Sequence, residues 1–433
     1  MDPGTDHVTP YDRLALTDLQ VEPLLLAGSH ERELTALFGD DEYRQLRRLA
    51  AEAHARPLLP GAEHVLIVPG IMGSQLGIQR RAPLPDDILW LDPVDIGNGR
   101  LSALRLNEET ARASGVIALG PVLHSYLKLK LRLRAAGFEP ELHPYDWRLS
   151  LEASGRELAE KLDRYVDRRT LLVAHSMGGL VARVALRILK NRPARIVLLG
   201  TPQSGSFAAV QALRGTYAVV RKVARLDHRH DAEHLAQHVF SSFPSVYEML
   251  PTAELSGAID LFDPRAWPAQ GPGPEPQLLQ RASRFQSSLG PVDDGVALIV
   301  GVNQETVTAV EAAQDEFRYT ITRRGDGTVP LACAQLGGAR TYYTGAAHSE
   351  LTRDPFVTQV LIELLQRGET SLLPTRWATR SRAEAKITDR ELRLTHAGKV
   401  DWSRLGPDAR RIYLQNLNDP PRLRLRIPSR PSR

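Results

Sequence analysis

Short runs of consecutive apolar residues recur along the chain, and segments with helical spacing separate most of them. A continuous apolar run predicts a strand buried on both faces, whereas apolar positions that recur every three or four residues predict an amphipathic helix. The repeated alternation of the two predicts a mostly parallel sheet with helices on both faces, which is an α/β fold. The predicted strands are 64–68, 138–142, 171–174, 195–199, 296–300, 317–322 and 340–343.

Helical spacing begins before the first predicted strand and returns after the last one. Ser154 is followed three residues later by Glu157, which is the spacing of a capping box, so a helix is predicted to begin at Ser154. The other helices predicted around the core strands are 31–38, 41–55, 124–136 and 355–368.

The same pattern divides the chain into regions. Residues 1–60 show helical spacing without evident chemistry, and they are predicted to form an N-terminal helical extension. Residues 61–368 hold the alternating strands and helices of the main domain. Within it, 81–125 has few regular patterns and is assigned to a flap region, and the loss of strand pattern over 203–286 predicts a helical cap or lid. Residues 369–433 are predicted to be a basic C-terminal extension.

Composition limits the classes of function. The chain has 433 residues with a net charge of +4, too small a charge to predict a nucleic-acid partner by itself. No apolar run is long enough for a membrane-spanning helix, and the acidic start of the chain does not resemble a signal peptide. The single cysteine, Cys333, excludes an internal disulfide and is expected in the core; it fits a reducing compartment, so a cytoplasmic location is expected.

Charge is concentrated near the C-terminus. Residues 376–433 carry 15 Lys and Arg against 6 Asp and Glu. A solvated tail is the favoured interpretation. The alternative is attraction to an anionic surface, for which lipid is preferred over nucleic acid because no nucleic-acid-binding motif accompanies the charge. Peripheral contact with a membrane is therefore one expectation.

The stretch around Ser176 has the pattern of a nucleophile elbow. Apolar residues 171–174 predict a strand, helical spacing resumes at Leu180, and the serine lies between them among small residues. The motif is Ala-x-Ser-x-Gly, with Ala174 where glycine is usual, and the small residues allow a sharp turn that exposes the hydroxyl. The alternative is an ordinary strand–helix junction with a bystander serine.

A Pro-Gly corner follows the first predicted strand. Pro69-Gly70-Ile71 would turn backbone N–H groups outward, and in an esterase such a loop supplies half of the oxyanion hole. Ile71 is the predicted donor, and Met177, directly after the serine, is the predicted second donor. A simple turn is the alternative.

A serine nucleophile needs a histidine to accept its proton and a carboxylate to orient that histidine. In chains with a nucleophile elbow the order is serine, acid, histidine. Asp326 lies between two glycines after a predicted strand, and His348 lies on a small-residue loop after the next one, so they are the predicted acid and base. Taken singly, Asp326 could belong to a hairpin turn and His348 to the surface. No cofactor is expected.

Other polar residues compete poorly for a catalytic role. His175 adjoins the serine but is expected to point away from it and to be structural. His230, His234 and His238 recur every fourth residue, which could bind a metal on a helix, but no further ligand is evident, so a solvated helix face is favoured and no metal is expected.

Two aromatic stretches are harder to interpret. Trp90 belongs to an apolar cluster that is either an exposed lipid-contacting flap or ordinary packing, and packing is favoured. Asp146 and Arg148, beside an aromatic residue, suit a buried ion pair at the edge of a pocket, although Asp146 could instead fix its own loop.

Taken together, the motifs resemble those of the lecithin–cholesterol acyltransferase family, which includes lysosomal phospholipase A2 and the phospholipid–diacylglycerol acyltransferases. The likeness spans about residues 64–365. The motifs that carry it are VPGIMGS (68–74), YDWR (145–148), AHSMGG (174–179), GTPQSG (200–205), FPSVY (243–247), GDGTVP (325–330) and AHS (347–349).

The resemblance implies an α/β-hydrolase fold with a cap and a membrane-binding flap. By motif position it implies Ser176 as nucleophile, Asp326 as acid and His348 as base. It also implies that the region of Trp90, with Met72 nearby, contacts lipid and the acyl chain. The secreted members carry a flap disulfide that a chain with one cysteine cannot form.

The expected function is a serine hydrolase that cleaves the acyl groups of ester lipids or passes them to an alcohol, through an acyl-enzyme. The rivals are an esterase or thioesterase for a soluble substrate, and an inactive module that docks on a membrane or a partner. The lipid class, the acceptor and the oligomeric state stay open.

Overall fold

The structure of the chain is a computed structural model that describes residues 15–417 and residue 419, except positions 56, 107–114, 166, 258, 291, 293–294 and 379–382. Its centre is a sheet of parallel strands in the order β11-β8-β7-β6-β1-β5, as the apolar runs predict. From one edge to the other, the strands are β11 (Arg340–Thr344), β8 (Val296–Gly301), β7 (Arg195–Leu199), β6 (Thr170–His175), β1 (His64–Val68) and β5 (Glu139–Leu142).

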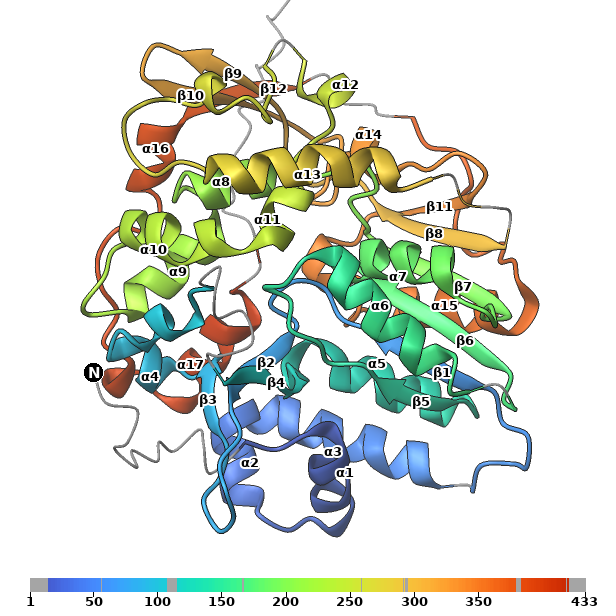
Figure 1. Cartoon of the computed structure of the whole chain (residues 1–433). Coiled ribbons are helices and arrows are strands. Elements are labelled where there is room, and N and C mark those ends of the chain that lie inside the picture. Colours follow the sequence, from blue (N-terminus) through green and yellow to red (C-terminus); the bar gives the residue numbers. More distant parts are fainter. Residues whose placement is uncertain are drawn as a thin grey trace, which may run out of the picture.

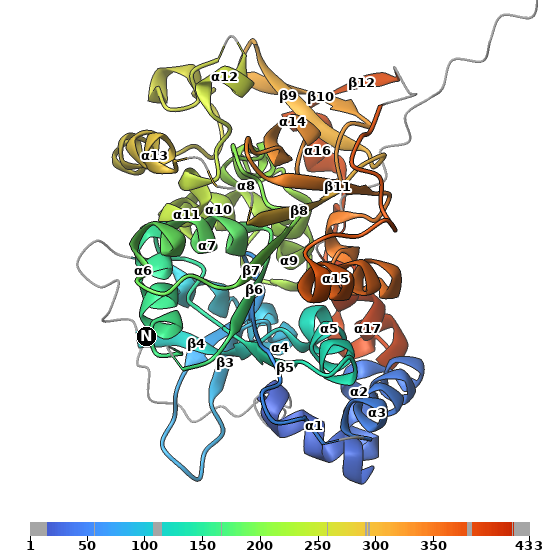
Figure 2. The same ribbon diagram turned by 90° about the vertical axis from the view of Figure 1, so that its right-hand side faces the viewer.

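Helices cover both faces of this sheet. Figure 2 shows the sheet from its side, with α6 (Leu151–Leu162) and α7 (Met177–Ile188) on one face and α5 (Leu123–Ala135) and α15 (Pro355–Arg367) on the other. Side chains of β6 alternate between the two layers: Leu172 packs in the core beneath α6 and α7, and Leu171 in the core beneath α5 and α15. Because both faces are buried, the whole strand is apolar.

The predicted start of α6 is wrong. The helix begins at Leu151, and the Ser150 hydroxyl caps it by accepting a hydrogen bond from the backbone N–H of Ala153 at 3.2 Å. Ser154 has the spacing of a capping box but lies inside the helix, because Ser150 precedes it and meets the first open N–H groups.

The N-terminal region contains one helix more than the pattern predicts. The predicted helices are α2 (Glu31–Phe38) and α3 (Asp40–His54), and the additional helix is α1 (Asp18–Ala27), which contains Pro23. These helices pack around Leu127 and Leu131 on the outer side of α5, at the opposite end of the molecule from β9 and β10 (Figure 1).

The stretch 81–125 is more regular than its sequence indicates. An antiparallel sheet forms there from β2, β3 and β4, and Arg148 secures it by donating hydrogen bonds to the carbonyl oxygens of Leu104 at 2.9 Å and Val116 at 3.2 Å. Asp146 pairs with Arg148 at 2.6 Å, so the expected ion pair fixes its own loop and the flap together. The elements are β2 (Ser74–Ile78), β3 (Asp87–Trp90), α4 (Pro93–Gly97), η2 (Arg100–Leu104) and β4 (Val116–Pro121).

The stretch after β7 is helical, as its pattern predicts. Its helices lie over the carboxyl ends of the central strands and include the buried aromatic residues Phe240 and Phe243. They are α8 (Phe207–Leu213), α9 (Ala218–Leu226), α10 (Ala232–His238), η3 (Phe240–Ser242), α11 (Pro244–Glu248), α12 (Ala253–Ser256), η4 (Pro264–Ala266) and α13 (Pro276–Ser288).

Two expectations about the last third of the chain are wrong. The predicted strand 317–322 is β10 (Glu316–Thr322), but it belongs to a separate antiparallel sheet with β9 (Thr306–Ala313) and β12 (Glu384–Thr388), not to the central sheet. The favoured solvated tail is packed over its described part, because β12 pairs with β10 and further helices follow it. These helices are α16 (Asp389–Leu394), η6 (Trp402–Arg404) and α17 (Pro407–Gln415), and the short elements after β10 are α14 (Leu331–Ala334) and η5 (His348–Glu350).

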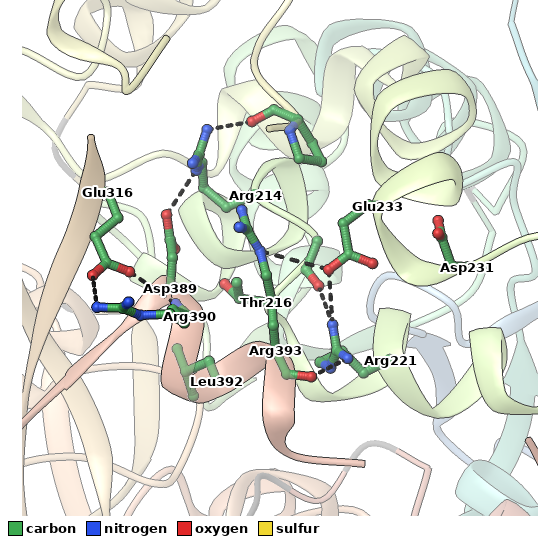
Figure 3. A network of polar contacts seen from close by, with 12 residues as sticks. Arg214, Thr216, Arg221, Asp231, Glu233, Glu316, Asp389, Arg390, Leu392 and Arg393 are labelled. Atoms are coloured by element: carbon green, nitrogen blue, oxygen red, sulfur yellow. Dashed lines mark hydrogen bonds and ion pairs between the residues drawn. The ribbon is translucent and has the colours of Figure 1, made fainter. Parts of the chain in front are cut away.

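A buried ion pair joins this C-terminal region to the cap. Figure 3 shows Arg214, at the end of α8, beside Asp389 at the start of α16; the guanidinium Nε lies 2.9 Å from the carboxylate, and both side chains are fully buried. The carboxylate also accepts hydrogen bonds from the backbone N–H of Phe317 at 3.2 Å and the hydroxyl of Tyr319 at 2.7 Å. The C-terminal region is therefore part of the folded body.

Within the described part of the chain, no helix combines the length and the apolar character that crossing a bilayer requires.

Candidate active site

Ser176 lies at the turn between β6 and α7 in a strained backbone conformation. Its φ is 54° and its ψ is −129°, values that a residue with a side chain rarely adopts. The turn is possible because its neighbours are small: a Cβ on Gly178 would lie 2.3 Å from the Pro69 carbonyl oxygen. The strain holds the hydroxyl above the carboxyl edge of the sheet, at the amino terminus of α7, where the helix dipole favours negative charge.

His348 and Asp326 lie in line with this serine. The Nε2 atom of His348 is 2.9 Å from the Ser176 hydroxyl oxygen, and its Nδ1 atom is 2.7 Å from the Asp326 carboxylate. The three residues are 172 and 22 positions apart in the sequence, so the fold alone brings them together. In this geometry a neutral imidazole protonated at Nδ1 donates to the carboxylate and presents Nε2 to accept the serine proton.

Asp326 is held by its own loop. One carboxylate oxygen accepts backbone N–H groups from Thr328 at 2.9 Å and Val329 at 2.7 Å, which leaves the other oxygen for His348. The Asp326 backbone carbonyl also accepts the N–H of His348 at 2.9 Å. The side chain is 2% exposed, so little water competes for the carboxylate. Asp326 and His348 are thus fixed to each other by backbone as well as side chain.

The loop after β1 approaches the serine closely. A Cβ on Gly70 would lie 2.8 Å from the Ser176 Cβ, so only glycine allows this approach. In the described residues, the backbone N–H groups of Ile71 and Met177 donate to no protein acceptor. Both N–H groups thus have no protein acceptor, which is one requirement of an oxyanion hole.

Trp90 is buried packing rather than an exposed flap residue. Its side chain is 1% exposed and its indole N–H donates to the backbone carbonyl of Met72 at 3.0 Å. It packs edge to face against Trp147, which in turn packs against Phe243 of the cap, at centroid distances of 5.4 and 5.7 Å. The two residues predicted to contact substrate, Trp90 and Met72, thus pack against each other next to Ile71.

The other histidines considered for a catalytic or metal-binding role do not contact the Ser176 hydroxyl. His175 points away from the serine hydroxyl and bonds to Tyr126 and to the backbone of His348. His230, His234 and His238 lie at and along α10, and His234 and His238 are exposed. The rings of His230 and His234 are stacked, whereas those of His234 and His238 are tilted by 52°. No group of three or more side chains suited to hold a metal occurs among the described residues.

Several residues at the site were not found from the sequence. Tyr126 lies in a helix rich in leucine and basic residues, and nothing in that pattern distinguishes it. The backbone donors of Thr328 and Val329 follow only from the loop conformation. Leu417 lines a small cavity with Met72, and Asp419 accepts a hydrogen bond from the hydroxyl of Ser349. Both lie in the segment expected to be a solvated tail, so only the folded chain brings them near the site.

The strand order, the strained serine between a central strand and its helix, and the acid and histidine that follow later strands define the α/β-hydrolase fold. Residues 114–271 match the sequence model of the family described as lecithin:cholesterol acyltransferase, which confirms the resemblance seen in the motifs. The matched stretch includes Ser176 and much of the cap, and it ends before Asp326 and His348.

Comparison with curated proteins finds the Uncharacterized protein YJR098C of Saccharomyces cerevisiae, 30% identical over 112 residues. The match covers 25% of this chain and 17% of that protein's length. Similar solved structures include the Tle4-Tli4 complex, with a TM-score of 0.46 and 15% identity over 71% of this chain and 99% of the other. Another is the Bacillus licheniformis lipase BlEst2 in mature form, with a TM-score of 0.38 and 16% identity over 72% and 96% of the two chains.

Proposed function

We propose that this protein is a serine hydrolase that cleaves the acyl groups of ester lipids or transfers them to an alcohol. The observation that carries the proposal is the hydrogen-bonded line from the Ser176 hydroxyl through the His348 imidazole to the Asp326 carboxylate. The family match over residues 114–271 supports chemistry on acyl esters. In this proposal residues 61–368 carry the chemistry, with a flap at 81–125 and a cap at 203–286, between extensions at 1–60 and 369–433.

The reaction would proceed in two halves. The Ser176 oxygen bonds to the ester carbonyl carbon while its proton passes to His348 Nε2. The N–H groups of Ile71 and Met177 donate hydrogen bonds to the carbonyl oxygen and stabilise its negative charge. The carbon–oxygen bond to the leaving alcohol then breaks, and His348 returns the proton to that alcohol. Water or a second alcohol, activated by the same histidine, then releases the acyl group from the serine.

The proposal further specifies a lipid substrate, peripheral contact with a membrane and a cytoplasmic location. The alternatives are an esterase for a soluble ester and an inactive docking module. The lipid enzyme would turn over faster when its substrate passes from monomers into vesicles, whereas an esterase for a soluble substrate would show no such increase. Mass spectrometry of products from a mixed lipid extract, with and without an added alcohol, would separate hydrolysis from transfer.

The direct test is labelling with a fluorophosphonate probe, together with turnover of an ester. The wild-type chain should be labelled, and Ser176→Ala should lose the label and lower kcat by about three to six orders of magnitude without unfolding. A matched control is Ser154→Ala, because Ser154 is a buried serine in the interior of α6. A wild-type chain that takes no label, or a Ser176→Ala variant that keeps most of its turnover, would refute the proposal.

A further inference from the structure

A chain of buried hydrogen bonds joins the loop of Ile71 to the backbone of His348. The Gly70 N–H donates to the Tyr126 hydroxyl oxygen at 2.8 Å, and that hydroxyl lies 3.0 Å from His175 Nδ1. At the other side of the same ring, His175 Nε2 lies 3.2 Å from the backbone carbonyl oxygen of His348. The chain runs behind Ser176 and does not touch its hydroxyl.

The direction of each bond follows from chemistry. A carbonyl oxygen only accepts, so His175 must carry its proton on Nε2 and donate it to His348. Its Nδ1 is then a bare acceptor for the hydroxyl proton of Tyr126, whose oxygen accepts the Gly70 N–H. Burial lowers the pKa of His175 to about 3, so the ring stays neutral and the directions persist near neutral pH.

We propose that Tyr126 and His175 are positioning residues that set the distance between the oxyanion donors and the catalytic base. Gly70 directly precedes Ile71, and His175 holds the backbone of the residue that supplies the base. The substrate carbon must meet the serine while its oxygen meets the donors, so a small change in this spacing weakens transition-state contacts more than substrate binding. This inference rests on the proposed function.

The test compares Tyr126→Phe with Tyr247→Phe in the full chain. Tyr247 is an equally buried tyrosine whose hydroxyl also accepts one backbone N–H, from Glu275 at 2.8 Å, and donates to one backbone carbonyl, of Ser241 at 2.7 Å. Each variant loses one bond accepted from a backbone N–H and one donated bond, which goes to an imidazole nitrogen in Tyr126 and to a backbone carbonyl in Tyr247. On a p-nitrophenyl ester, Tyr126→Phe should lower kcat by about 10- to 100-fold with KM nearly unchanged, whereas Tyr247→Phe should stay within about twofold.

A double-mutant cycle measures the coupling between Tyr126 and His175, which separates a positioning role from a merely structural one. Combining Tyr126→Phe with His175→Phe should lower kcat/KM no further than the more severe single variant, because either change interrupts the same chain of bonds. Equal losses in Tyr126→Phe and Tyr247→Phe, or fully additive losses in the cycle, would overturn the positioning role while leaving Ser176-dependent turnover in the wild type. Absence of that turnover would instead refute the proposed function, and the positioning role with it.

A second observation concerns the C-terminal strap, defined here as α17 with Asn416, Leu417 and Asp419. Leu414 and Leu417 are buried and line a small cavity together with Met72 and Trp90, on the side of the oxyanion loop. On the side of the base, the Asp419 carboxylate is hydrogen-bonded to the hydroxyl of Ser349, the residue after His348. The strap therefore contacts both the segment after Ile71 and the residue after His348.

Polar contacts fasten the strap at its end. The Lys222 ammonium of α9 donates to the carbonyl oxygens of Asn416 at 2.6 Å, Leu417 at 3.3 Å and Asp419 at 2.6 Å. These carbonyls follow the last turn of α17, where the helix dipole favours a positive charge. Arg353 adds a bond to the Gln415 carbonyl at 3.1 Å.

We also infer that the strap is a lid that must move before a substrate reaches Ser176. In the present arrangement Ser176 and His348 are each 7% exposed, and an ester carbonyl has to touch both the serine and the loop of Ile71. In this proposal the strap, which touches Met72 on one side and Ser349 on the other, covers the approach to the serine. Its last residues are held by Leu417 and by polar contacts, so they can release without unfolding the central sheet.

Lys222→Met tests the lid, and Lys399→Met is its matched control. Lys399 also donates to three backbone carbonyls, those of Ala224 at 2.9 Å, Asp227 at 2.5 Å and His230 at 2.6 Å, but it lies away from the strap end. We expect Lys222→Met to raise the second-order rate of fluorophosphonate labelling at Ser176 by about tenfold, and Lys399→Met to change it by less than about twofold.

Equal labelling rates in the wild type and Lys222→Met would overturn the lid. Slower labelling in Lys222→Met, with folding intact by circular dichroism, would also overturn it and would indicate that the strap forms part of the substrate site. If no variant is labelled, the serine chemistry itself fails, and the lid with it.

Discussion

The pair of Arg214 and Asp389 offers a stringent test of how the C-terminal region is held. Asp389→Asn keeps the size and shape of the side chain and removes its charge. It leaves the Arg214 guanidinium buried without an anion, because the two side chains are 1% and 0% exposed. In the described structure, the guanidinium then keeps only carbonyl acceptors, of Pro268 at 3.4 Å, Gln270 at 2.9 Å and Pro272 at 2.5 Å.

The magnitude follows from this burial. Removing one partner of a buried ion pair typically costs about 3–5 kcal/mol, since the remaining charge is uncompensated. The carbonyl contacts of Arg214 offset part of that cost, so the lower end, about 3 kcal/mol, is expected. With its oxygen toward Arg214 and the Phe317 N–H, the asparagine turns its NH2 group toward the Tyr319 hydroxyl, which can accept from it, so the lost charge is the main cost.

Thermal unfolding measures the effect. Trp267 packs on Phe317 at a centroid distance of 5.5 Å, so tryptophan fluorescence reports on the neighbourhood of the pair, and far-ultraviolet circular dichroism reports on the whole chain. Asp389→Asn should lower Tm on the order of 5 °C or more in both signals.

Glu316→Gln is the control for this prediction. Glu316 and Arg390 also join the strand β10 to α16, but their atoms are 3.6 Å apart and Arg390 is 82% exposed. An exposed pair of this kind contributes about 0–1 kcal/mol, so Tm should hardly move. If Asp389→Asn is no more destabilised than Glu316→Gln, the argument from buried charge is wrong for this region.

Three further predictions concern the site and the core. Gly70→Ala should lower kcat by at least about tenfold, because its Cβ would lie 2.8 Å from that of Ser176, whereas Gly273→Ala, with open space around it, should be neutral in the same ester assay. Asp326→Asn should lower kcat by about four orders of magnitude with the fold retained by circular dichroism, since the imidazole loses the partner that fixes its tautomer; near-normal turnover would argue against the acid. Burial lowers the pKa of His143 from 6.5 to about 3. Between those pH values the unfolded chain binds more protons than the folded chain, so the free energy of unfolding falls on acidification by up to about 1.4 kcal/mol per pH unit. His143→Phe should flatten the dependence of Tm on pH in that window, and an unchanged slope would contradict it.

The central part of the fold could be predicted because its constraints are local. The residues of β6 are apolar on both faces, and the small residues around Ser176 are required by a turn whose neighbours lie within a few positions. His348 follows β11 of the central sheet, and the carboxyl ends of parallel strands meet at one edge, so its approach to Ser176 could also be expected. Asp326 follows β10 of the separate antiparallel sheet, so it could be predicted from the order of serine, acid and histidine along the chain but not from the central sheet.

Other features depend on contacts that no local pattern contains. The strand β9 escaped prediction because only Thr306 and Val310 are buried in it, so no apolar run or alternation marks it, and α1 escaped because Pro23 lies within it. The start of α6 was misplaced because two serines four residues apart both suit a cap, and only the course of the chain decides between them. Tyr126 matters through contacts with Gly70 and His175, which lie 56 and 49 positions away.

The misreading of the C-terminal region has an electrostatic reason. Its excess of basic residues looks like a solvated tail when the segment is considered alone. In the described structure, however, Lys386 pairs with Glu311, Arg390 with Glu316 and Arg393 with Glu233, all of them acids outside the segment. Charge counted along a segment therefore overstates the charge that the folded region presents to solvent, because the compensating acids come from β9, β10 and α10. A composition-based case for attraction to an anionic surface must consequently rest on basic residues other than these three.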